Sequence, residues 1–217
     1  MSNVITTTVE QAAAHIRAGE LVAFPTETVY GLGADASNDK AVAKIFAAKG
    51  RPADHPLIVH LASSTQVSDY ASSVPPFAQA LIKAFWPGPL TLVCRAQPSL
   101  QWDLGDTGGT VALRMPLHRT ALALLELTGP LAVTSANRTG SPPATTCDEA
   151  LAQLGESVSV YLDGGPSGAT LASTIVMQPN FFEHLSTVLE ETPIETWRDI
   201  LHARIIRSSA PYLPEAF

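Results

Sequence analysis

The chain alternates short apolar runs with longer amphipathic segments along most of its length. Short runs rich in Val, Leu, Ile and Phe predict buried strands at 21–24, 57–61, 90–96, 109–116, 130–137, 158–165 and 173–177. Segments whose apolar residues recur every three or four positions predict helices at 8–19, 39–50, 75–86, 119–129 and 146–155. This alternation favours an α/β or α+β protein built on a sheet.

Two of the predicted helices carry end signals. Thr8 and Gln11 have the spacing of a capping box at the start of the first helix, and Gly19 is expected to end it. Gly50 is expected to cap the C-terminus of the second helix. These signals predict the bounds of both helices.

The predicted elements form one continuous unit without an internal linker. The turn-rich segment 97–110 is interpreted as a functional loop rather than a domain boundary. The composition shifts after about residue 178. We therefore expect a catalytic domain at 1–178 and a divergent C-terminal tail at 179–217, packed on the same domain.

The composition is that of a core-rich globular protein. Hydrophobic residues make up 46% of the 217 positions and charged residues 15%, and the formal net charge is −7. Such a body does not hold long nucleic acid through bulk charge, because that requires a basic face. A small anion bound by a few local cations remains compatible with this composition.

The cysteines and the N-terminal segment point to a cytoplasmic protein. Cys94 and Cys147 form no CxxC pair, and they are interpreted as reduced thiols. The first twenty residues lack the basic and apolar regions of a signal peptide, and no run reaches the roughly 18 apolar residues of a membrane span. We expect no membrane association.

Common catalytic motifs are absent from the sequence. There is no GxxxxGK[ST] phosphate loop, no HExxH and no GxSxG. The segment "GLGADA" at 31–36 resembles the start of a dinucleotide-binding GxGxxG but lacks its third glycine. Any chemistry must therefore come from residues that are dispersed along the chain.

Polar side chains gather where the predicted strands meet loops, which is where sheet proteins of this kind bind ligands. The candidates are Thr26, Glu27, Thr28, Tyr30, Lys49, Arg51, His55, His60, Thr110, Arg114, Thr134, Ser135, Asn137, Ser173 and Thr174. Taken one at a time, none of them specifies a function.

Most candidates have a purely structural alternative. Lys49 at a helix C-terminus would complement the helix dipole, and Arg51 before a proline would suit a surface turn. His60 inside an apolar strand is more often a hydrogen-bonded core histidine, and 134–137 could be an ordinary turn. Arg114 differs, because a charge among apolar strand residues needs a partner.

Taken together, the motifs resemble a known family. Six blocks occur in the order and approximate spacing of the YrdC-like threonylcarbamoyl-AMP synthases, over about residues 8 to 178: "PTETVYGLG", "KGRPADHPLIVH", "WPGPLTLV", "GGTVALRMP", "TSANRTG" and "STIV". The resemblance implies an α/β fold, with a twisted open mixed β-sheet and flanking helices around a large, positively charged cavity.

The resemblance also implies a reaction. A nucleotidyltransferase of this kind joins L-threonine, bicarbonate and ATP into threonylcarbamoyl-AMP and releases pyrophosphate. The product passes to a tRNA threonylcarbamoyltransferase complex for the threonylcarbamoyladenosine modification of tRNA. Mg²⁺ is expected to arrive with ATP rather than in a dedicated protein site, and tRNA itself is expected to bind weakly at most.

The family's functional residues carry over to positions of this chain. Its Lys-Arg-Ser-Asn set falls on Lys49, Arg51, Ser135 and Asn137, which the resemblance implies are catalytic. Threonine contacts are expected at Thr28, His60, Arg114, Thr134 and Ser173, with Arg114 on the carboxylate. ATP contacts are expected at Lys49, Arg51, His55, Thr110, Ser135, Ala136, Asn137 and Ala144.

The chain departs from the family pattern in two places. His55 stands where members often have Asn, and Met177 stands where Asp commonly follows "STIV". The arginine that follows in the family has no clear counterpart, and Arg198 and Arg207 are the candidates. The alternatives are a relative that binds nucleotide or RNA without synthase activity, and a carbamoyltransferase-type relative, which the single-domain length disfavours.

Overall fold

The computed structural model describes residues 3–50, 55–168 and 174–177. Its strands are β1 (Val4–Thr6), β2 (Val22–Phe24), β3 (Gly31–Asp35), β4 (Ile58–His60), β5 (Leu90–Arg95), β6 (Thr110–Arg114), β7 (Leu131–Ser135), β8 (Val160–Leu162) and β9 (Thr174–Met177). Its α-helices are α1 (Val9–Arg17), α2 (Asp39–Lys49), α3 (Val67–Tyr70), α4 (Pro76–Phe85), α5 (Arg119–Thr128) and α6 (Cys147–Leu154). Single 3₁₀ turns lie at Ser64–Gln66 and Gly155–Ser157.

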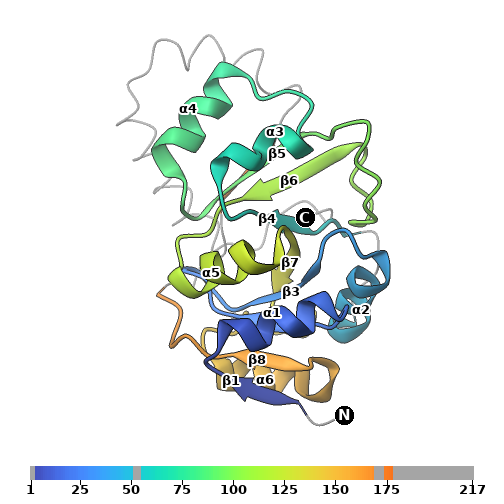
Figure 1. The fold of residues 1–217 in the computed structure, drawn as a ribbon, viewed down its shortest axis with the longest axis vertical. Helices are drawn as coiled ribbons and strands as arrows, with labels where there is room; N and C mark the ends of the chain where they lie inside the picture. The colour runs from blue at the N-terminus through green and yellow to red at the C-terminus, as the bar shows by residue number, and fades with distance from the viewer. Residues whose placement is uncertain (1–2, 51–54, 169–173, 178–217) are drawn as a thin grey trace.

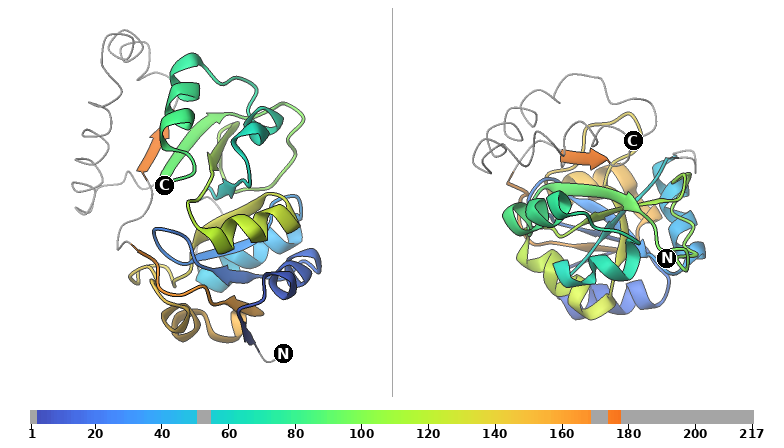
Figure 2. Two further views of the ribbon diagram at one scale, coloured as in Figure 1. Left: turned by 60° about the vertical axis from the view of Figure 1, so that its left-hand side comes forward. Right: turned by 90° about the horizontal axis from the view of Figure 1, so that it is seen from above.

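The described strands form one mixed sheet in the order β1-β8-β2-β3-β7-β4-β6-β5-β9. Strand β4 runs parallel to β6 and antiparallel to β7, and β3 is antiparallel to both β2 and β7. In Figure 1 the sheet runs from β1 and β8 at the bottom to β5 and β6 at the top. Figure 2 shows β9 beside β5 at the far edge. The predicted α/β fold with a mixed sheet is confirmed.

Each face of the sheet carries its own hydrophobic core, because successive strand residues point to opposite sides. In β2, Val22 and Phe24 join the core beneath α1 and α5, which lie side by side in front of β3 and β7 (Figure 1). Leu21 and Ala23 join the other core, which also receives residues of α2, α4 and α6.

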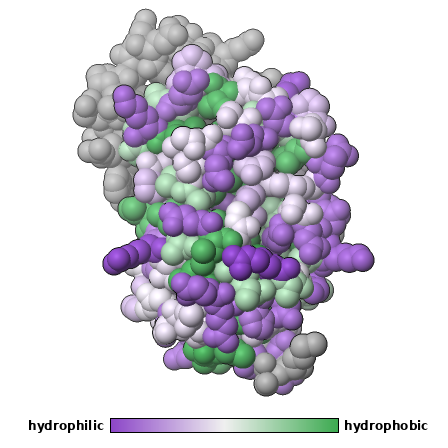
Figure 3. All heavy atoms as spheres, viewed as in Figure 1, coloured by the Kyte–Doolittle hydropathy of each residue, from purple (hydrophilic) through white to green (hydrophobic). Residues whose placement is uncertain are grey.

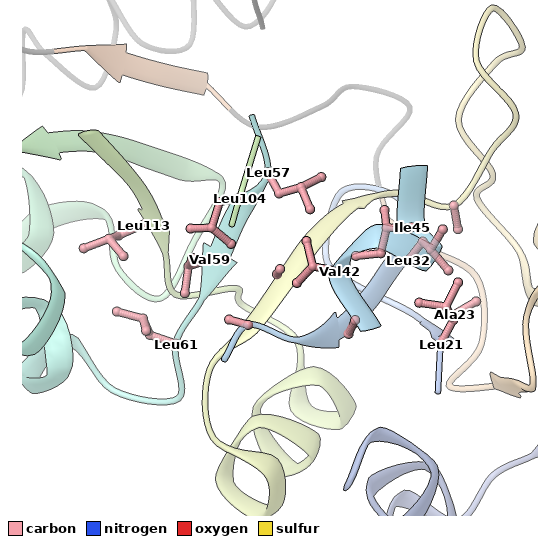
Figure 4. Close-up of a cluster of buried hydrophobic side chains, with 14 of the residues drawn as sticks. Leu21, Ala23, Leu32, Val42, Ile45, Leu57, Val59, Leu61, Leu104 and Leu113 are labelled. Atoms are coloured by element: carbon pink, nitrogen blue, oxygen red, sulfur yellow. The ribbon is translucent and has the colours of Figure 1, made fainter. Parts of the chain in front are cut away.

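The larger core continues across both halves of the sheet (Figure 4). Leu32 of β3 packs with Val42 and Ile45 of α2, while Val59 of β4 and Leu113 of β6 extend the same cluster toward β5. All five residues are essentially inaccessible to solvent. The strands that carry the candidate site therefore stand on a rigid apolar layer.

Most predicted elements are present, and the helix ends show one error. Gly50 is the C-cap of α2 with φ +62°, and Gly19 follows α1 with φ +75°, as predicted. Thr8 is the N-cap of α1, but its side chain makes no capping hydrogen bond. Its backbone N–H instead donates to the Oγ1 of Thr6 at 3.0 Å, so the predicted capping box is wrong.

The segment "GLGAD" forms β3, which the sequence pattern did not predict as a strand. A Cβ on Gly33 would lie 2.7 Å from Cε1 of Phe24, and a Cβ on Gly31 would lie 2.9 Å from Cγ1 of Val133. Both distances are too short for real side chains. Because these two positions lack a Cβ, the ring of Phe24 can lie against β3. The segment is a strand and does not form a dinucleotide-binding loop.

The segment 97–110 is tied into the larger core. Leu104 is buried, and its carbonyl oxygen accepts the N–H of Leu57 at 2.9 Å. Trp102 packs against Tyr70 with ring centroids 5.0 Å apart. This loop therefore covers apolar surface between α3 and β4, which is a structural role in addition to the predicted functional one.

The face drawn in Figure 3 mixes hydrophilic and hydrophobic residues. Among the described residues, the exposed large hydrophobic side chains are Ile5, Leu117 and Leu127. No helix in the described ranges is long and apolar enough to span a membrane. The predicted tail, 179–217, lies outside the described residues, so the domain division stays a prediction.

Candidate functional site

The polar segment "PTETVY" is the loop that joins β2 to β3. Phe24 and Gly31 are paired across the two strands, so residues 25–30 form the connection. The buried hydroxyl of Thr26 holds this loop in shape: it donates to the carbonyl oxygen of Val29 at 2.6 Å and lies 3.0 Å from the hydroxyl of Thr28. These bonds fix the direction of the next polar side chains.

Arg114 at the end of β6 reaches this loop and pairs with it. Its Nη2 donates to Oε1 of Glu27 at 2.6 Å and to Oγ1 of Thr28 at 3.1 Å. The side chain of Arg114 is 5% exposed and that of Glu27 is 16% exposed. The expectation that Arg114 needs a partner is thus confirmed, and the partner is a carboxylate in an environment that screens the pair poorly.

Several buried polar atoms around this ion pair have no hydrogen-bond partner among the described residues. They are Oε2 of Glu27, Nε of Arg114, both ring nitrogens of His60 and Nδ1 of His118. Such atoms are uncommon in folded proteins, and they mark positions where a ligand can supply the missing bonds. They concentrate where β4, β6 and the β2–β3 loop meet.

His60 is the most buried of these groups. Burial lowers its pKa well below the ordinary value of 6.5, and the neighbouring Arg114 guanidinium lowers it further. The pKa of His118 is also lowered by burial, although the charge of Glu27 opposes this shift. Both rings are therefore neutral at pH 7.

Lys49, the last residue of α2, is buried and binds the loop that follows β7. Its Nζ donates to the carbonyl oxygens of Ser135 at 2.6 Å and Asn137 at 2.7 Å, and to Oδ1 of Asn137 at 3.3 Å. Compensation of the helix dipole does not require burial, so these bonds give Lys49 a more specific role. It fixes the loop against the end of α2.

Asn137 and Tyr30 organise the same loop from two sides. The Nδ2 of Asn137 donates to the carbonyl oxygens of Arg138 and Ser141. The carbonyl oxygen of Tyr30 accepts from the N–H of Ala136, and its N–H donates to the carbonyl oxygen of Ala144, both at 2.8 Å. Two predicted ATP contacts, Ala136 and Ala144, are therefore brought together by Tyr30.

Tyr30 also joins this loop to the segment after β8. Its hydroxyl donates to the carbonyl oxygen of Gly165 at 2.7 Å and to Oδ1 of Asp163 at 3.3 Å. Burial raises the pKa of Tyr30, so the hydroxyl keeps its proton and remains a donor. Burial also raises the pKa of the Cys94 and Cys147 thiols to about 11, which fits the predicted reduced thiols.

The strand register places the remaining candidates. His60 pairs with Arg114 across β4 and β6, and Ser135 lies on the same face because it alternates with Thr134. Thr134 pairs with Leu32 and leaves the sheet on the opposite face, toward the larger core. The register therefore places the side chain of Thr134 on the opposite face from His60 and Arg114.

The predicted substrate contacts on β4 and β6 lie at different ends of these two strands, but the loop that the Arg114 side chain reaches lies at the nucleotide end, because Gly31 at the start of β3 pairs with Ser135. Thr110 begins β6, about 13 Å from Arg114 at about 3.3 Å per residue, and its hydroxyl donates to the carbonyl oxygen of Thr107. His55 precedes the parallel strand β4 and lies at the same end as Thr110. On β4 and β6, the backbones of His55 and Thr110 thus share one end and those of His60 and Arg114 the other. The side chain of Arg114 extends to Thr28 in the β2–β3 loop, which lies beside Ser135.

Several predicted residues lie outside the described residues. These are Arg51, Ser173, Arg198 and Arg207, so their roles stay predictions, as does the large positively charged cavity. Within the described ranges, no group of three or more His, Cys, Asp or Glu side chains could hold a metal ion. Mg²⁺ therefore remains an expectation that depends on ATP.

Sequence reasoning did not assign the roles of three residues in this site. The sequence marks Glu27 only as a polar residue after a strand. Its contact with Arg114 joins positions that are 87 residues apart, so no local pattern reveals it. His118 and Asp163 were not singled out at all. The one signal in the sequence was Arg114 itself, because a buried arginine calls for a carboxylate.

Comparison with known proteins identifies the family of this chain. The Sua5/YciO/YrdC family model, described as "Telomere recombination", matches residues 14–185. A Mycobacterium tuberculosis protein is 53% identical over 165 residues, 76% of each chain. A Bacillus subtilis threonylcarbamoyl-AMP synthase is 47% identical over 170 residues, 77% of this chain and 49% of that protein.

A solved structure extends the likeness to three dimensions. The crystal structure of Pyrococcus abyssi Sua5 complexed with L-threonine superposes with a TM-score of 0.77 and 43% identity, over 83% of this chain and 54% of that one. This chain thus spans about half the length of the Bacillus and Pyrococcus relatives. The family match and these identities establish that the chain belongs to the Sua5/YciO/YrdC family.

Proposed function

We propose that this protein is an L-threonylcarbamoyladenylate synthase. It joins L-threonine, bicarbonate and ATP into threonylcarbamoyl-AMP and pyrophosphate. One structural observation supports this most directly: the described part of the structure contains two buried cations, Lys49 at the end of α2 and Arg114 at the end of β6. ATP and threonine both carry negative charge, so a site that brings them together needs a cation for each. The relatives named threonylcarbamoyl-AMP synthase also support the assignment.

Arg114 and His60 form the amino-acid side of the proposed site. The free Nε of Arg114 would donate to the threonine carboxylate, and Arg suits this task because its planar fork matches a carboxylate. The neutral ring of His60 and the hydroxyl of Thr28 lie beside it and can bond the threonine hydroxyl. The Pyrococcus protein was solved in complex with L-threonine, which supports threonine as a substrate of this chain.

Lys49, with Arg51 in the role carried over from the family, forms the phosphate side. The bond from Nζ of Lys49 to Oδ1 of Asn137, at 3.3 Å, is longer than its bonds to the carbonyl oxygens of Ser135 and Asn137, so a phosphate oxygen would replace it most easily. His55, Thr110, Ser135 and Asn137 would surround the nucleotide. Mg²⁺ enters only as the counter-ion that ATP carries.

The chemistry then needs positioning and charge compensation rather than a protein nucleophile. The carboxylate oxygen of N-carboxy-threonine attacks the α-phosphorus of ATP, and the bond to pyrophosphate breaks. Fixed cations on both sides hold the two anions in line and stabilise the charge that develops on the leaving group. Nucleotidyl transfer is accordingly the reaction class that we assign.

The product has a defined destination in this proposal. Threonylcarbamoyl-AMP would pass to a tRNA threonylcarbamoyltransferase complex in the cytoplasm, where the tRNA is modified. Direct tRNA binding by this chain would be weak at most, because a net charge of −7 disfavours a polyanion. The same charge works against the alternative of an RNA-binding relative without synthase activity.

Pyrophosphate release tests the assignment directly. The purified protein is incubated with Mg²⁺-ATP, L-threonine and bicarbonate, and each substrate is omitted in turn. We expect pyrophosphate only in the complete mixture, together with an adenylate of the mass of threonylcarbamoyl-AMP. Absence of both products in the complete mixture, or equal release without threonine, would overturn the proposal.

A further inference from the structure

The ion pair of Glu27 and Arg114 leaves one atom of each partner unused. Oε1 of Glu27 accepts from Nη2 of Arg114, while Oε2 of Glu27 and Nε of Arg114 are buried and have no partner among the described residues. The unused atoms are one acceptor with negative charge and one donor with positive charge. A ligand that satisfies both must carry the complementary pair of charges.

Charge balance makes this requirement sharper. A carboxylate that binds Arg114 also approaches Glu27, whose own carboxylate repels it in a poorly screened environment. The repulsion is offset when the ligand brings a cation to Oε2 of Glu27. The nearby histidines do not supply that cation, since His60 and His118 are neutral at pH 7.

We propose that Glu27 is a specificity-determining residue whose Oε2 accepts the α-ammonium of the amino-acid substrate while Arg114 binds its carboxylate. The inference rests on the proposed function, because it takes threonine as the amino acid at this position. The inference adds Glu27 as the residue that binds the ammonium group. Glu27 and Arg114 together would then recognise an amino acid in its zwitterionic form. Hydroxy acids of the same shape are rejected because they leave Glu27 uncompensated.

A simpler role for Glu27 is to orient Arg114. That role uses Oε1 and is already served by the bond from Nη2 to Thr28 Oγ1, which holds the guanidinium from a second side. It does not account for the burial of Oε2 without a partner. The two roles differ in one measurable respect: only the ammonium contact makes the Glu27 charge discriminate between an amine and a hydroxyl.

The experiment compares two ligands by calorimetry in the full chain. L-threonine is compared with 2,3-dihydroxybutanoate, in which a hydroxyl replaces the amine, and ATP binding is measured separately. Glu27→Gln retains an oxygen for Arg114 but removes the charge. Glu126→Gln, an exposed position on α5, is the matched control.

We expect the wild type and Glu126→Gln to prefer threonine over the hydroxy acid. In Glu27→Gln, threonine should bind about tenfold more weakly or worse, while the hydroxy acid binds as well as before or better and ATP binding is unchanged. If Glu27→Gln weakens both ligands equally, Glu27 only orients Arg114 and the proposal is wrong.

Two further results separate this inference from the proposed function. If the wild type prefers threonine and releases pyrophosphate but Glu27→Gln keeps that preference, the function stands and the inference fails. If the wild type binds ATP but not threonine, and releases no pyrophosphate, both fail. Should Glu27→Gln not fold, Glu27→Asp replaces it: retained preference for the amine supports the proposal, and loss of preference overturns it.

Discussion

The Nζ of Lys49 lies 2.7 Å from the backbone carbonyl oxygen of Asn137, a residue 88 positions further along the chain. The same ammonium donates to the carbonyl oxygen of Ser135 at 2.6 Å. A buried lysine whose donors hold two backbone carbonyls fixes the loop after β7, and we propose that its charge also binds a phosphate of ATP. Loss of this side chain must therefore affect stability and activity together.

Lys49→Met tests this double role, because it keeps the length of the side chain and removes the donors. The carbonyl oxygen of Asn137 then loses the ammonium donor, and that of Ser135 keeps only the backbone N–H of Asn137, which should lower the free energy of unfolding by about 1–3 kcal/mol. The rate of pyrophosphate release should fall by about a hundredfold or more, since a phosphate charge is left uncompensated. Denaturant unfolding and the release assay measure the two effects.

The matched control is Lys44→Met in the same helix. Lys44 is exposed and donates to the carbonyl oxygen of Gly19 at 2.7 Å, away from the site. We expect it to cost less than about 1 kcal/mol and to leave the rate unchanged. A Lys49→Met protein that keeps most of the wild-type rate would show that Lys49 is purely structural.

Arg114→Lys tests whether the fork geometry matters. A lysine keeps the charge but cannot bond Glu27, Thr28 and a carboxylate in one plane. The KM for threonine should rise about tenfold or more, while the KM for ATP stays within about twofold, because Arg114 is assigned to the threonine carboxylate and not to the phosphates. Steady-state kinetics with one substrate varied at a time measure both constants.

The exposed Arg119 at the start of α5 supplies the comparison. Arg119→Lys should leave both KM values unchanged. Equal increases in the KM for threonine and the KM for ATP in Arg114→Lys would place Arg114 between the two substrates and contradict its assignment to threonine.

The sequence predicted the elements whose apolar pattern is strong. Strand β4 and helix α2 were found because their apolar residues point into a core on one side. Strand β3 was missed because Gly31 and Gly33 carry no side chain to show a pattern. Their role depends on the ring of Phe24 across the sheet, which is a tertiary contact that local propensity does not contain.

The site was predicted by residue type but not by contact. Arg114 was expected to need a partner, yet its partner Glu27 could be identified only from the fold, which brings the β2–β3 loop to the end of β6. Thr134 and Ser135 are adjacent in the sequence, and the pleat sends their side chains to opposite faces. Register, which local sequence patterns do not determine, decides which of them shares a face with His60 and Arg114.

Gly33→Ala tests the close approach of Phe24 to β3. The added Cβ would lie 2.7 Å from Cε1 of Phe24, so the ring must move within a packed core. We expect the free energy of unfolding to fall by about 1–3 kcal/mol. Thermal or denaturant unfolding measures the loss.

The double variant Gly33→Ala with Phe24→Leu is the control for this cause. Phe24→Leu alone should destabilise the protein by leaving a cavity, and the added methyl should then fit without a clash. The two changes together should therefore cost less than the sum of the single changes. If the losses in unfolding free energy from Gly33→Ala and Phe24→Leu are strictly additive, a clash between the new Cβ and the Phe24 ring is not the cause of the Gly33→Ala effect.

His60 predicts a specific dependence of stability on pH. Its pKa in the folded protein is well below 6.5, so between these two values the unfolded chain binds a proton that the folded protein does not. Stability from the neutral ring is therefore present above pH 6.5 and is lost as the pH falls toward the folded pKa. The slope approaches about 1.4 kcal/mol per pH unit for one group.

Unfolding measured between pH 7.5 and about pH 5.5 tests this, because carboxylates titrate mainly below that window. His60→Gln should flatten the decline, and combination with His118→Gln should flatten it further, since burial lowers the pKa of His118 as well. The change Glu126→Gln at an exposed position of α5, away from both histidines in the sequence, should leave the slope unchanged in this window. A His60→Gln protein with the wild-type slope would mean that the ring becomes protonated inside the folded site.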